Sequence, residues 1–351
     1  MTATFYNGAQ SAPDTETKEQ LTGALLTKVV QQEIDSKVFD DVFGIFTDRG
    51  LQVGAQIEEF EVANLQATDF DPTGANTLKK ANMDFKALYH KINRKKTYKA
   101  TVSDKQLREA MLSKENLATT ASAIINELYN SSSIDDFEAV KTLLNDIAGE
   151  KKEMPICDMK GKGSDMDELT KAIQAVATNM TLPSTQYNYA GFKKEFNPKS
   201  DLVLIIDSAT NARLGVETLA NSFNPDKKAT VSNVIVIDEM PNFEYSDLKA
   251  TKGKSIATSA DSSVDMYKYN SEGTETVSGK PICFLLNRKA IKRINVERNL
   301  KTQENGAGDF TNYYLHATDL LSYSTLRNAV VFVDGETVEP TEPTEPTEPN
   351  E

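Results

Sequence analysis

The sequence predicts an α+β fold, in which helices and strands largely occupy separate parts of one chain. Apolar residues recur at helical spacing between 117 and 147, apolar and polar residues alternate between 88 and 102, and short continuous apolar runs appear beyond residue 200. The length of 351 residues allows one large or two modest hydrophobic cores. Hydrophobic residues (39%) and charged residues (26%) occur in ordinary proportions, which indicates a soluble globular protein.

Residues 1–49 are predicted to form an N-terminal arm and a helix. Residues 1–15 are polar and include Gly8 and Pro13, which favours an extended arm. Between 17 and 43 apolar side chains recur near every 3.6 residues, at Leu21, Leu25, Val29, Ile34, Val38 and Val42. The first residues lack the charged start and apolar run of a signal peptide, and no stretch approaches the roughly 20 apolar residues of a membrane span. We therefore expect a protein that is neither exported nor inserted in a membrane.

Residues 50–103 are predicted to form an extended loop of two strands. Residues 57–62 read as one strand, and Asp71-Pro72-Thr73-Gly74 reads as a turn. Period-two alternation then follows over 88–92 and 98–102 in a stretch with few apolar residues. An isolated two-stranded ribbon is marginally stable in water, so this extension needs a neighbour on which to lie.

Residues 104–200 are predicted to hold a long spine helix and a peripheral domain. One apolar stripe comprises Leu117, Ala121, Ile124 and Leu128, and a second comprises Phe137, Val140, Leu144 and Ile147. Ser131-Ser132-Ser133 can cap the start of a second helical segment, and Gly149 is expected to end it. A helix of roughly 30 residues spans about 45 Å, whether it is straight or bent at the serines. Ser164 is expected to cap a further helix carrying Met166, Leu169, Ile173 and Val176.

Residues 201–334 are predicted to form an axial α/β domain with closing strands. The apolar runs 201–207, 231–237 and 282–286 are typical of strands buried on both faces, and 326–333 forms a closing strand. The polar stretch 243–279 is expected to be a long loop, either functional or disordered.

Residues 335–351 are predicted to be a disordered tail. Glu-Pro-Thr repeats with period three from 339, which excludes a helix and favours a solvated extended chain. Seven acids and no Lys or Arg lie between Asp334 and Glu351, so the rest of the chain carries −6 of the net charge of −13. The body is therefore mildly acidic and shows no large basic field of a nucleic-acid reader.

The candidate catalytic and metal sites are all weak, so we expect neither an enzyme nor a cofactor. Lys252-Gly253-Lys254-Ser255 resembles the end of a phosphate-binding loop, but Leu248 stands where its first Gly should be. Asp165 and Asp167 suit the first turn of a helix better than a metal pair. His90 and His316 have no nucleophile motif beside them and read as packed or solvated residues. Cys157 and Cys283 lack metal or redox spacing and are expected to be buried thiols of a protein made in a reducing compartment.

A basic run offers the best candidate contacts, namely Lys91, Arg94, Lys95, Lys96 and Lys99. It is interpreted as a set of inter-subunit contacts that meet an acidic neighbouring copy. A nucleic-acid patch would need more aromatic interleaving than Tyr89 and Tyr98 provide. A merely solvated strand face remains a third alternative.

The order of these parts resembles the major capsid proteins of tailed double-stranded DNA bacteriophages, whose fold also forms encapsulin shells and the herpesvirus capsid floor. The local matches are 234–241 (VIVIDEMP), 283–291 (CFLLNRKAI) and the ending 313–333. The resemblance covers nearly the whole chain except the repeat tail. It implies an N-terminal arm, an extended loop, a spine helix, and peripheral and axial domains, with no catalytic residues to transfer.

The resemblance implies a structural subunit that assembles itself into the icosahedral head shell of a virion. Rings of five and six copies would close into a shell around double-stranded DNA held without sequence specificity, in the cytoplasm of a bacterial host. Scaffolding, portal and head-fibre proteins are the further partners that it implies. The alternatives are an encapsulin-type compartment and a bacterial surface protein with a Pro-Thr-Glu spacer.

Overall fold

The computed structural model describes residues 39–48, 56–65, 67, 69–70, 72–73, 80, 82–103, 114–221, 233–260 and 262–335, without the side chains of 114–121 and 215–221. Most of the predicted N-terminal arm and helix, much of the predicted turn at 71–74 and the repeat tail lie outside these residues.

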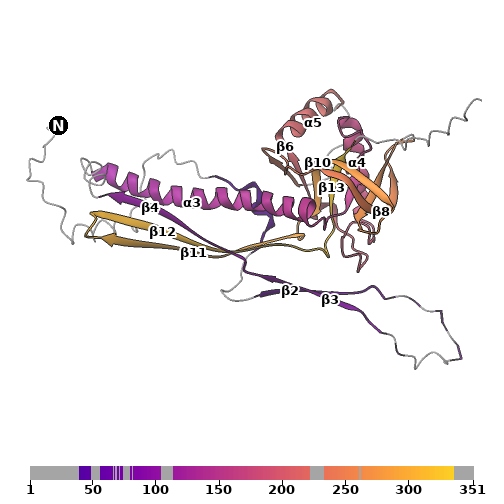
Figure 1. The fold of residues 1–351 in the computed structure, drawn as a ribbon, viewed down its shortest axis with the longest axis horizontal. Helices are drawn as coiled ribbons and strands as arrows, with labels where there is room; N and C mark the ends of the chain where they lie inside the picture. Colours follow the sequence, from indigo (N-terminus) through magenta and orange to yellow (C-terminus); the bar gives the residue numbers. More distant parts are fainter. Residues whose placement is uncertain are drawn as a thin grey trace, which may run out of the picture. The chain divides into compact units, whose positions relative to one another are not determined.

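The described residues form both helices and strands in a mixed arrangement (Figure 1). The helical segments are η1 (Val42–Phe46), α3 (Lys114–Asn145), the π-helical turn η2 (Asp146–Glu150), α4 (Met166–Met180), η3 (Lys199–Asp201) and α5 (Ser208–Asn221). The strands are β1 (Thr47–Asp48), β2 (Gln56–Val62), β3 (Phe85–Lys91), β4 (Arg94–Ser103), β5 (Ile156–Asp158), β6 (Leu202–Asp207), β7 (Asn233–Ile237), β8 (Tyr245–Ala257), β9 (Ser263–Tyr269), β10 (Glu275–Asn287), β11 (Ile291–Asn305), β12 (Phe310–Tyr323) and β13 (Ala329–Asp334).

The chain divides into two compact units. In the part of the chain that the structure describes, the first takes its residues from 39–40, 95–103, 114–135 and 298–317, and the second from 41–94, 136–297 and 318–335. In the first unit, Tyr98 of β4 donates a hydrogen bond to Asp135 of α3 at 2.6 Å. On β4, Thr97 bonds His316 of β12 at 3.0 Å, and Thr101 donates to Asn312 of β12 at 2.7 Å. These polar bonds tie the helix and the strands of this unit together.

Helix α3 runs without a break through the three serines, so of the two forms that the sequence left open the unbroken helix is the one present. Its buried face continues at four-residue spacing through Leu128, Ser132, Asp136, Val140 and Leu144. Ser132 therefore occupies one position of the buried face instead of capping a second helix. The helix ends in η2, where a side chain on Gly149 would come within 3.0 Å of Phe243.

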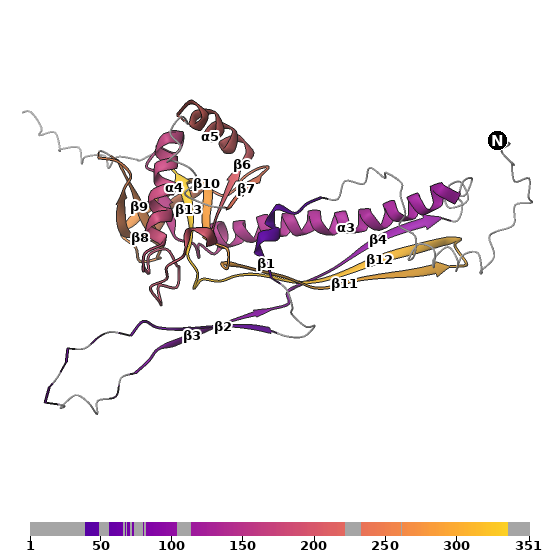
Figure 2. The same ribbon diagram turned by 180° about the vertical axis from the view of Figure 1, so that it is seen from behind.

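A seven-stranded sheet of order β13-β5-β9-β8-β10-β6-β7 holds the core of the second unit. Five buried residues from five strands lie in register across it: Met266, Cys157, Phe332, Cys283 and Ile206. They belong to the core layer that α4 covers with Leu169, Ile173 and Val176. Figure 2 shows α4 and α5 beside this sheet. The predicted strands at 201–207, 282–286 and 326–333 are confirmed, and both thiols are free and buried as expected.

Three local predictions for this unit were wrong. The stretch 243–279 is not a loop but contains β8, β9 and the start of β10. Strand β8 buries few side chains, such as Leu248 and Ala250, and a strand with a mostly polar solvent face resembles a loop by composition. Strand β7 lies at the edge of the sheet order and leaves Val234 and Val236 exposed, so it is not buried on both faces. The cap of α4 is Asp165 and not Ser164.

The carboxylate of Asp165 accepts hydrogen bonds from the backbone N–H groups of Asp167 and Glu168, at 2.9 and 3.3 Å. This geometry confirms the capping interpretation of the two acids.

The predicted extension contains one ribbon and not all of the alternating stretch. Strands β2 and β3 pair antiparallel from Gln56↔Lys91 to Val62↔Phe85. Residues 98–102 instead lie in β4, which neighbours β12 in a four-stranded sheet of order β1-β11-β12-β4. The long strand β11 in that sheet went unpredicted, because its buried residues lie only at its start. Most of β12 lies in the ending 313–333, where the resemblance implied closing strands.

Candidate assembly surface

The ribbon formed by β2 and β3 buries charged side chains and exposes an apolar one, which is the reverse of the usual arrangement. Along β2 the acids Glu59 and Glu61 are buried, whereas Phe60 between them is 55% exposed. Across the ribbon His90 is buried on the same face as the acids. A strand at a solvent surface normally buries its apolar residues, so the outward face of this ribbon needs an explanation.

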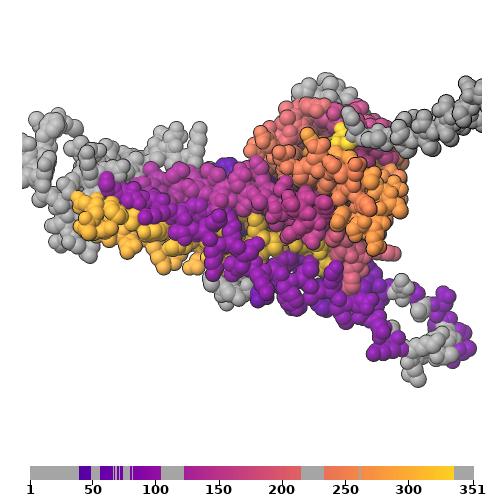
Figure 3. Space-filling model, in the orientation of Figure 1, coloured from indigo at the N-terminus to yellow at the C-terminus, as the bar shows by residue number. Residues whose placement is uncertain are grey.

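The outward face of the ribbon presents three large aromatic rings. Phe85 is 58% exposed and stacks on Phe60 with a centroid distance of 5.4 Å. Tyr89 is 61% exposed and donates a hydrogen bond to Glu58 at 3.0 Å, which raises the pKa of the phenol. Ribbon residues are uncovered on the face seen in Figure 3, where they are indigo to purple. We call Phe60, Phe85 and Tyr89 the aromatic face.

The segments that lead away from the paired strands continue this apolar exposure. Leu65, Phe70 and Met83 are all exposed in the described part of the chain. Adjacent exposed rings such as Phe60 and Phe85 are of the kind that marks a site of protein association.

The buried acids of the ribbon meet cations from distant parts of the second unit. Arg327 contacts Glu59 at 2.6 Å and Glu61 at 2.8 Å. Burial alone would raise the pKa of Glu59, but hydrogen bonds from His90 and Ser324 and the charges of Lys292 and Arg327 outweigh it and lower this pKa to about 2. Glu59 is therefore ionised in the folded protein at neutral pH.

The basic run predicted from the sequence divides into two groups. Lys91, Lys95, Lys96 and Lys99 are exposed, and the ammonium of Lys99 lies 5.6 Å from the ring centre of Tyr314. Arg94 is instead largely buried and pairs with Asp136, and its Nη1 lies 3.6 Å from Asp319.

The partner of Arg94 is shared with a second arginine. Asp136 also accepts from Arg293 at 3.2 Å, and Arg293 pairs in turn with Asp41. No local pattern in the sequence signals this cluster, because its members come from five separate segments.

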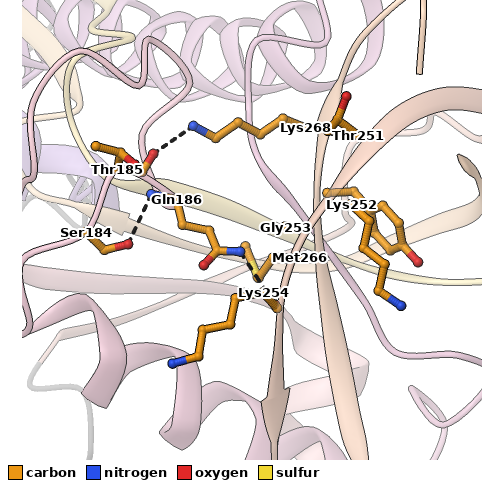
Figure 4. A pocket seen from close by; sticks show the side chains of 10 residues that line it. Ser184, Thr185, Gln186, Thr251, Lys252, Gly253, Lys254, Met266 and Lys268 are labelled. Atoms are coloured by element: carbon orange, nitrogen blue, oxygen red, sulfur yellow. Dashed lines mark hydrogen bonds between the residues drawn. The ribbon is translucent and has the colours of Figure 1, made fainter. Parts of the chain in front are cut away.

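The motif Lys252-Gly253-Lys254-Ser255 lies on strand β8, so it is neither a phosphate-binding loop nor a mobile loop. Its first three residues line a pocket of about 380 Å³ together with Gln186 and Lys268 (Figure 4). The ammonium of Lys268 donates to the backbone oxygens of Thr185 and Asn188, at 2.7 and 2.5 Å. Burial lowers the pKa of Lys268 to about 8, and two of its three N–H donors are already occupied by the carbonyl oxygens.

The two histidines lie in different surroundings. His90 is buried between Ser322 and Glu59, 2.7 and 3.3 Å away, and His316 stacks on Tyr314 with a centroid distance of 6.2 Å. Within the described ranges, no three His, Cys, Asp or Glu side chains gather in a way that could hold a metal ion. Of the helices in those ranges, none is long and apolar enough to cross a bilayer.

Known proteins match the chain over most of its length. The family model of the Phi29-like phage major capsid protein matches residues 6–333. The major capsid protein of Bacillus phage GA-1 is 26% identical over 312 residues, covering 87% of this chain and 58% of that protein. The major capsid protein of Bacillus phage B103 is 25% identical over 335 residues, covering 90% and 66%. The chain thus spans about 60% of the length of these relatives.

Solved capsid structures share the fold. A chain in the capsid structure of Staphylococcus phage Andhra superposes with a TM-score of 0.64 at 14% identity, covering 88% of this chain and 89% of that chain. A chain in the structure of the head fiber and inner core protein gp22 of native bacteriophage P68 gives 0.63 at 14% identity, with 88% of both chains covered. The resemblance drawn from the order of the segments is confirmed. The chain belongs to the family of Phi29-like phage major capsid proteins.

Proposed function

We propose that this chain is the structural subunit of the head shell of a tailed phage and that it works by assembling with copies of itself. Its family and its fold likeness to phage capsid chains support this function. The encapsulin-type compartment and the bacterial surface protein are not favoured by the relatives, which are all phage major capsid proteins.

The observation that carries the proposal is the aromatic face of the ribbon. Two stacked phenylalanines exposed by more than half are costly to leave in water. Covering the exposed part of each ring contributes about 2–3 kcal/mol at roughly 25 cal/mol per Å². A second copy of the chain is the proposed cover, so the two rings of each ribbon contribute about 4–6 kcal/mol to one contact in the shell.

The exposed lysines of the basic run serve this assembly as contacts with an acidic neighbouring copy. Lys91, Lys95, Lys96 and Lys99 remain in this role, and the mildly acidic body of the chain supplies the complementary charge. Arg94 acts within its own subunit through its pair with Asp136.

The division of the chain into arm, extended loop, spine with peripheral domain, axial domain and tail belongs to the same proposal. Rings of five and six copies close into a shell in the virion, around DNA held by weak and non-specific contacts. Scaffolding, portal and head-fibre proteins are the proposed further partners, and no catalytic step is part of the function.

The test replaces both phenylalanines of the aromatic face. The double variant Phe60→Ser/Phe85→Ser should fold like the parent but raise the concentration needed for particle formation about a thousandfold, as about 4 kcal/mol requires. Phe196→Ser is the matched control, because Phe196 is 62% exposed and lies outside the ribbon. Sedimentation and negative-stain microscopy measure the particles. Equal assembly of the double variant and the control would contradict the proposal, and particles that enclose protein cargo instead of DNA would favour the compartment.

A further inference from the structure

We propose that Arg327 is a positioning residue that fixes the direction of the β2–β3 ribbon before the subunit meets its neighbours. The inference rests on the proposed function, because it concerns how the aromatic face is presented for assembly. It adds a specific residue, placed between β12 and β13, that does not itself touch the aromatic face.

Arg327 joins three carboxylates from two segments of the second unit. Its Nε contacts Glu59 at 2.6 Å and its Nη2 contacts Glu61 at 2.8 Å, both on β2. Its Nη1 contacts Glu195 at 3.3 Å, in the segment between α4 and η3. A guanidinium presents its donors in a rigid plane, so these contacts orient β2 as well as attract it.

Further polar contacts hold the same strand from the same side. The ammonium of Lys193 contacts Glu61 at 2.8 Å, and that of Lys292 lies 3.9 Å from Glu59. The backbone N–H of Lys194 donates to Asn64 at 2.7 Å, just beyond the end of β2. These contacts surround Arg327, which alone reaches both buried acids of β2 among the described residues.

Charge makes this docking directional in a way that apolar packing would not. Glu59 and Glu61 are almost fully buried, and a buried acid without a partner is strongly destabilising. A shift of the ribbon by one residue would exchange its two faces and bury Phe60 in place of the acids. Only one placement pairs both acids with cations, so the ribbon is held with its aromatic face outward before assembly. Such preorganisation lowers the entropy cost of association.

Hydrogen exchange on the full chain, held below its assembly concentration, tests the inference. Arg327→Lys keeps the charge but removes the planar fork. We expect the protection of β2 and β3 amides to fall about tenfold or more, while that of β10 and β13 stays unchanged. Arg288→Lys is the control, because the Nε of this exposed arginine donates a hydrogen bond to the backbone oxygen of Ile45 at 2.7 Å. Unchanged ribbon protection in the Arg327→Lys variant would overturn the inference.

A second variant covers the case in which Arg327→Lys unfolds the whole subunit. Glu61→Gln removes one of the three carboxylates that contact Arg327 and should reduce hydrogen-exchange protection in the ribbon alone. In the combined variant Arg327→Lys/Glu61→Gln, the loss of ribbon protection should be smaller than the sum of the two single losses, because both changes act on one cluster. Additive losses, or a Glu61→Gln variant with full ribbon protection, would count against the inference. Both readouts use the unassembled subunit, so they are independent of the Phe60→Ser/Phe85→Ser assembly test.

Discussion

Replacing Asp136 by Asn removes one negative charge from a buried cluster that holds two arginines. One oxygen of Asp136 faces Arg94 and the other accepts from Arg293 at 3.2 Å. Asn keeps the shape of the side chain and one acceptor oxygen, so the change tests charge more than packing. Asp41 and Asp319 then remain as the carboxylates that face the two guanidinium groups.

The expected loss of stability is about 3–5 kcal/mol, the usual cost of breaking a buried ion pair by removing one partner. Both arginines keep one acid, which places the expectation at the lower end of that range. By contrast, Asp238 contacts Lys141 at 2.8 Å but is exposed, and an exposed pair is worth about 1 kcal/mol or less. Asp238→Asn is therefore a matched control with the same chemical change.

Urea unfolding of the unassembled subunit measures the difference between the two variants. Asp136→Asn should shift the midpoint clearly, whereas Asp238→Asn should leave it nearly unchanged. If Asp136→Asn costs less than about 1 kcal/mol, the buried cluster is solvated or relaxed and the assignment of Arg94 to an internal role is wrong.

Three further predictions concern other parts of the second unit. The pKa of Glu59 falls from its ordinary 4.5 to about 2, so its contribution of up to about 3 kcal/mol to the free energy of unfolding should be complete above pH 4.5 and lost as the pH falls toward 2. Glu59→Gln should flatten this part of the pH–stability curve, and equal curves for parent and variant would refute the prediction. Burial raises the pKa of both Cys157 and Cys283, so iodoacetamide at pH 8 should label neither thiol until the protein unfolds, as mass spectrometry can show. Gly279 has φ +132°, and a side chain there would come within 2.2 Å of the backbone oxygen of Asp334. Gly279→Ala should therefore lower the free energy of unfolding by about 3 kcal/mol or more, and a neutral effect in urea unfolding would contradict this geometry.

Local periodicity predicted those helices and strands whose apolar pattern repeats within a short stretch of sequence. The apolar spacing of Val140 and Leu144 predicted the buried face of α3, and the continuous apolar runs predicted β6 and β13. The same spacing could not decide whether α3 breaks at its serines, because a serine can either cap a new helix or occupy a buried position within an unbroken one. Its neighbours at i−4 and i+4 decided that Ser132 stays within the helix.

Composition is a poor guide to secondary structure where strands carry polar side chains. Strand β8 reads as a loop because Lys and Thr occupy its exposed positions, yet it pairs with β9 and β10 along most of its length. Backbone pairing depends little on side-chain polarity when one face meets solvent. The partner strands lie farther along the chain, so no local window contains the information.

By itself, the sequence indicated a strand at 57–62 and alternating faces over 88–92, because these signals need only neighbouring residues, and β2 and β3 overlap both ranges. It also indicated the family through the order of its segments. Only the tertiary structure decided which face of the ribbon is covered, since Arg327 and Lys193 come from more than 130 residues away and supply the charges that draw Glu59 and Glu61 inward. Likewise Arg94, read from the sequence as an outward contact, turns inward because Asp136 and Asp319 meet it there. A two-residue period separates the faces of a strand, but distant partners determine which of them is buried.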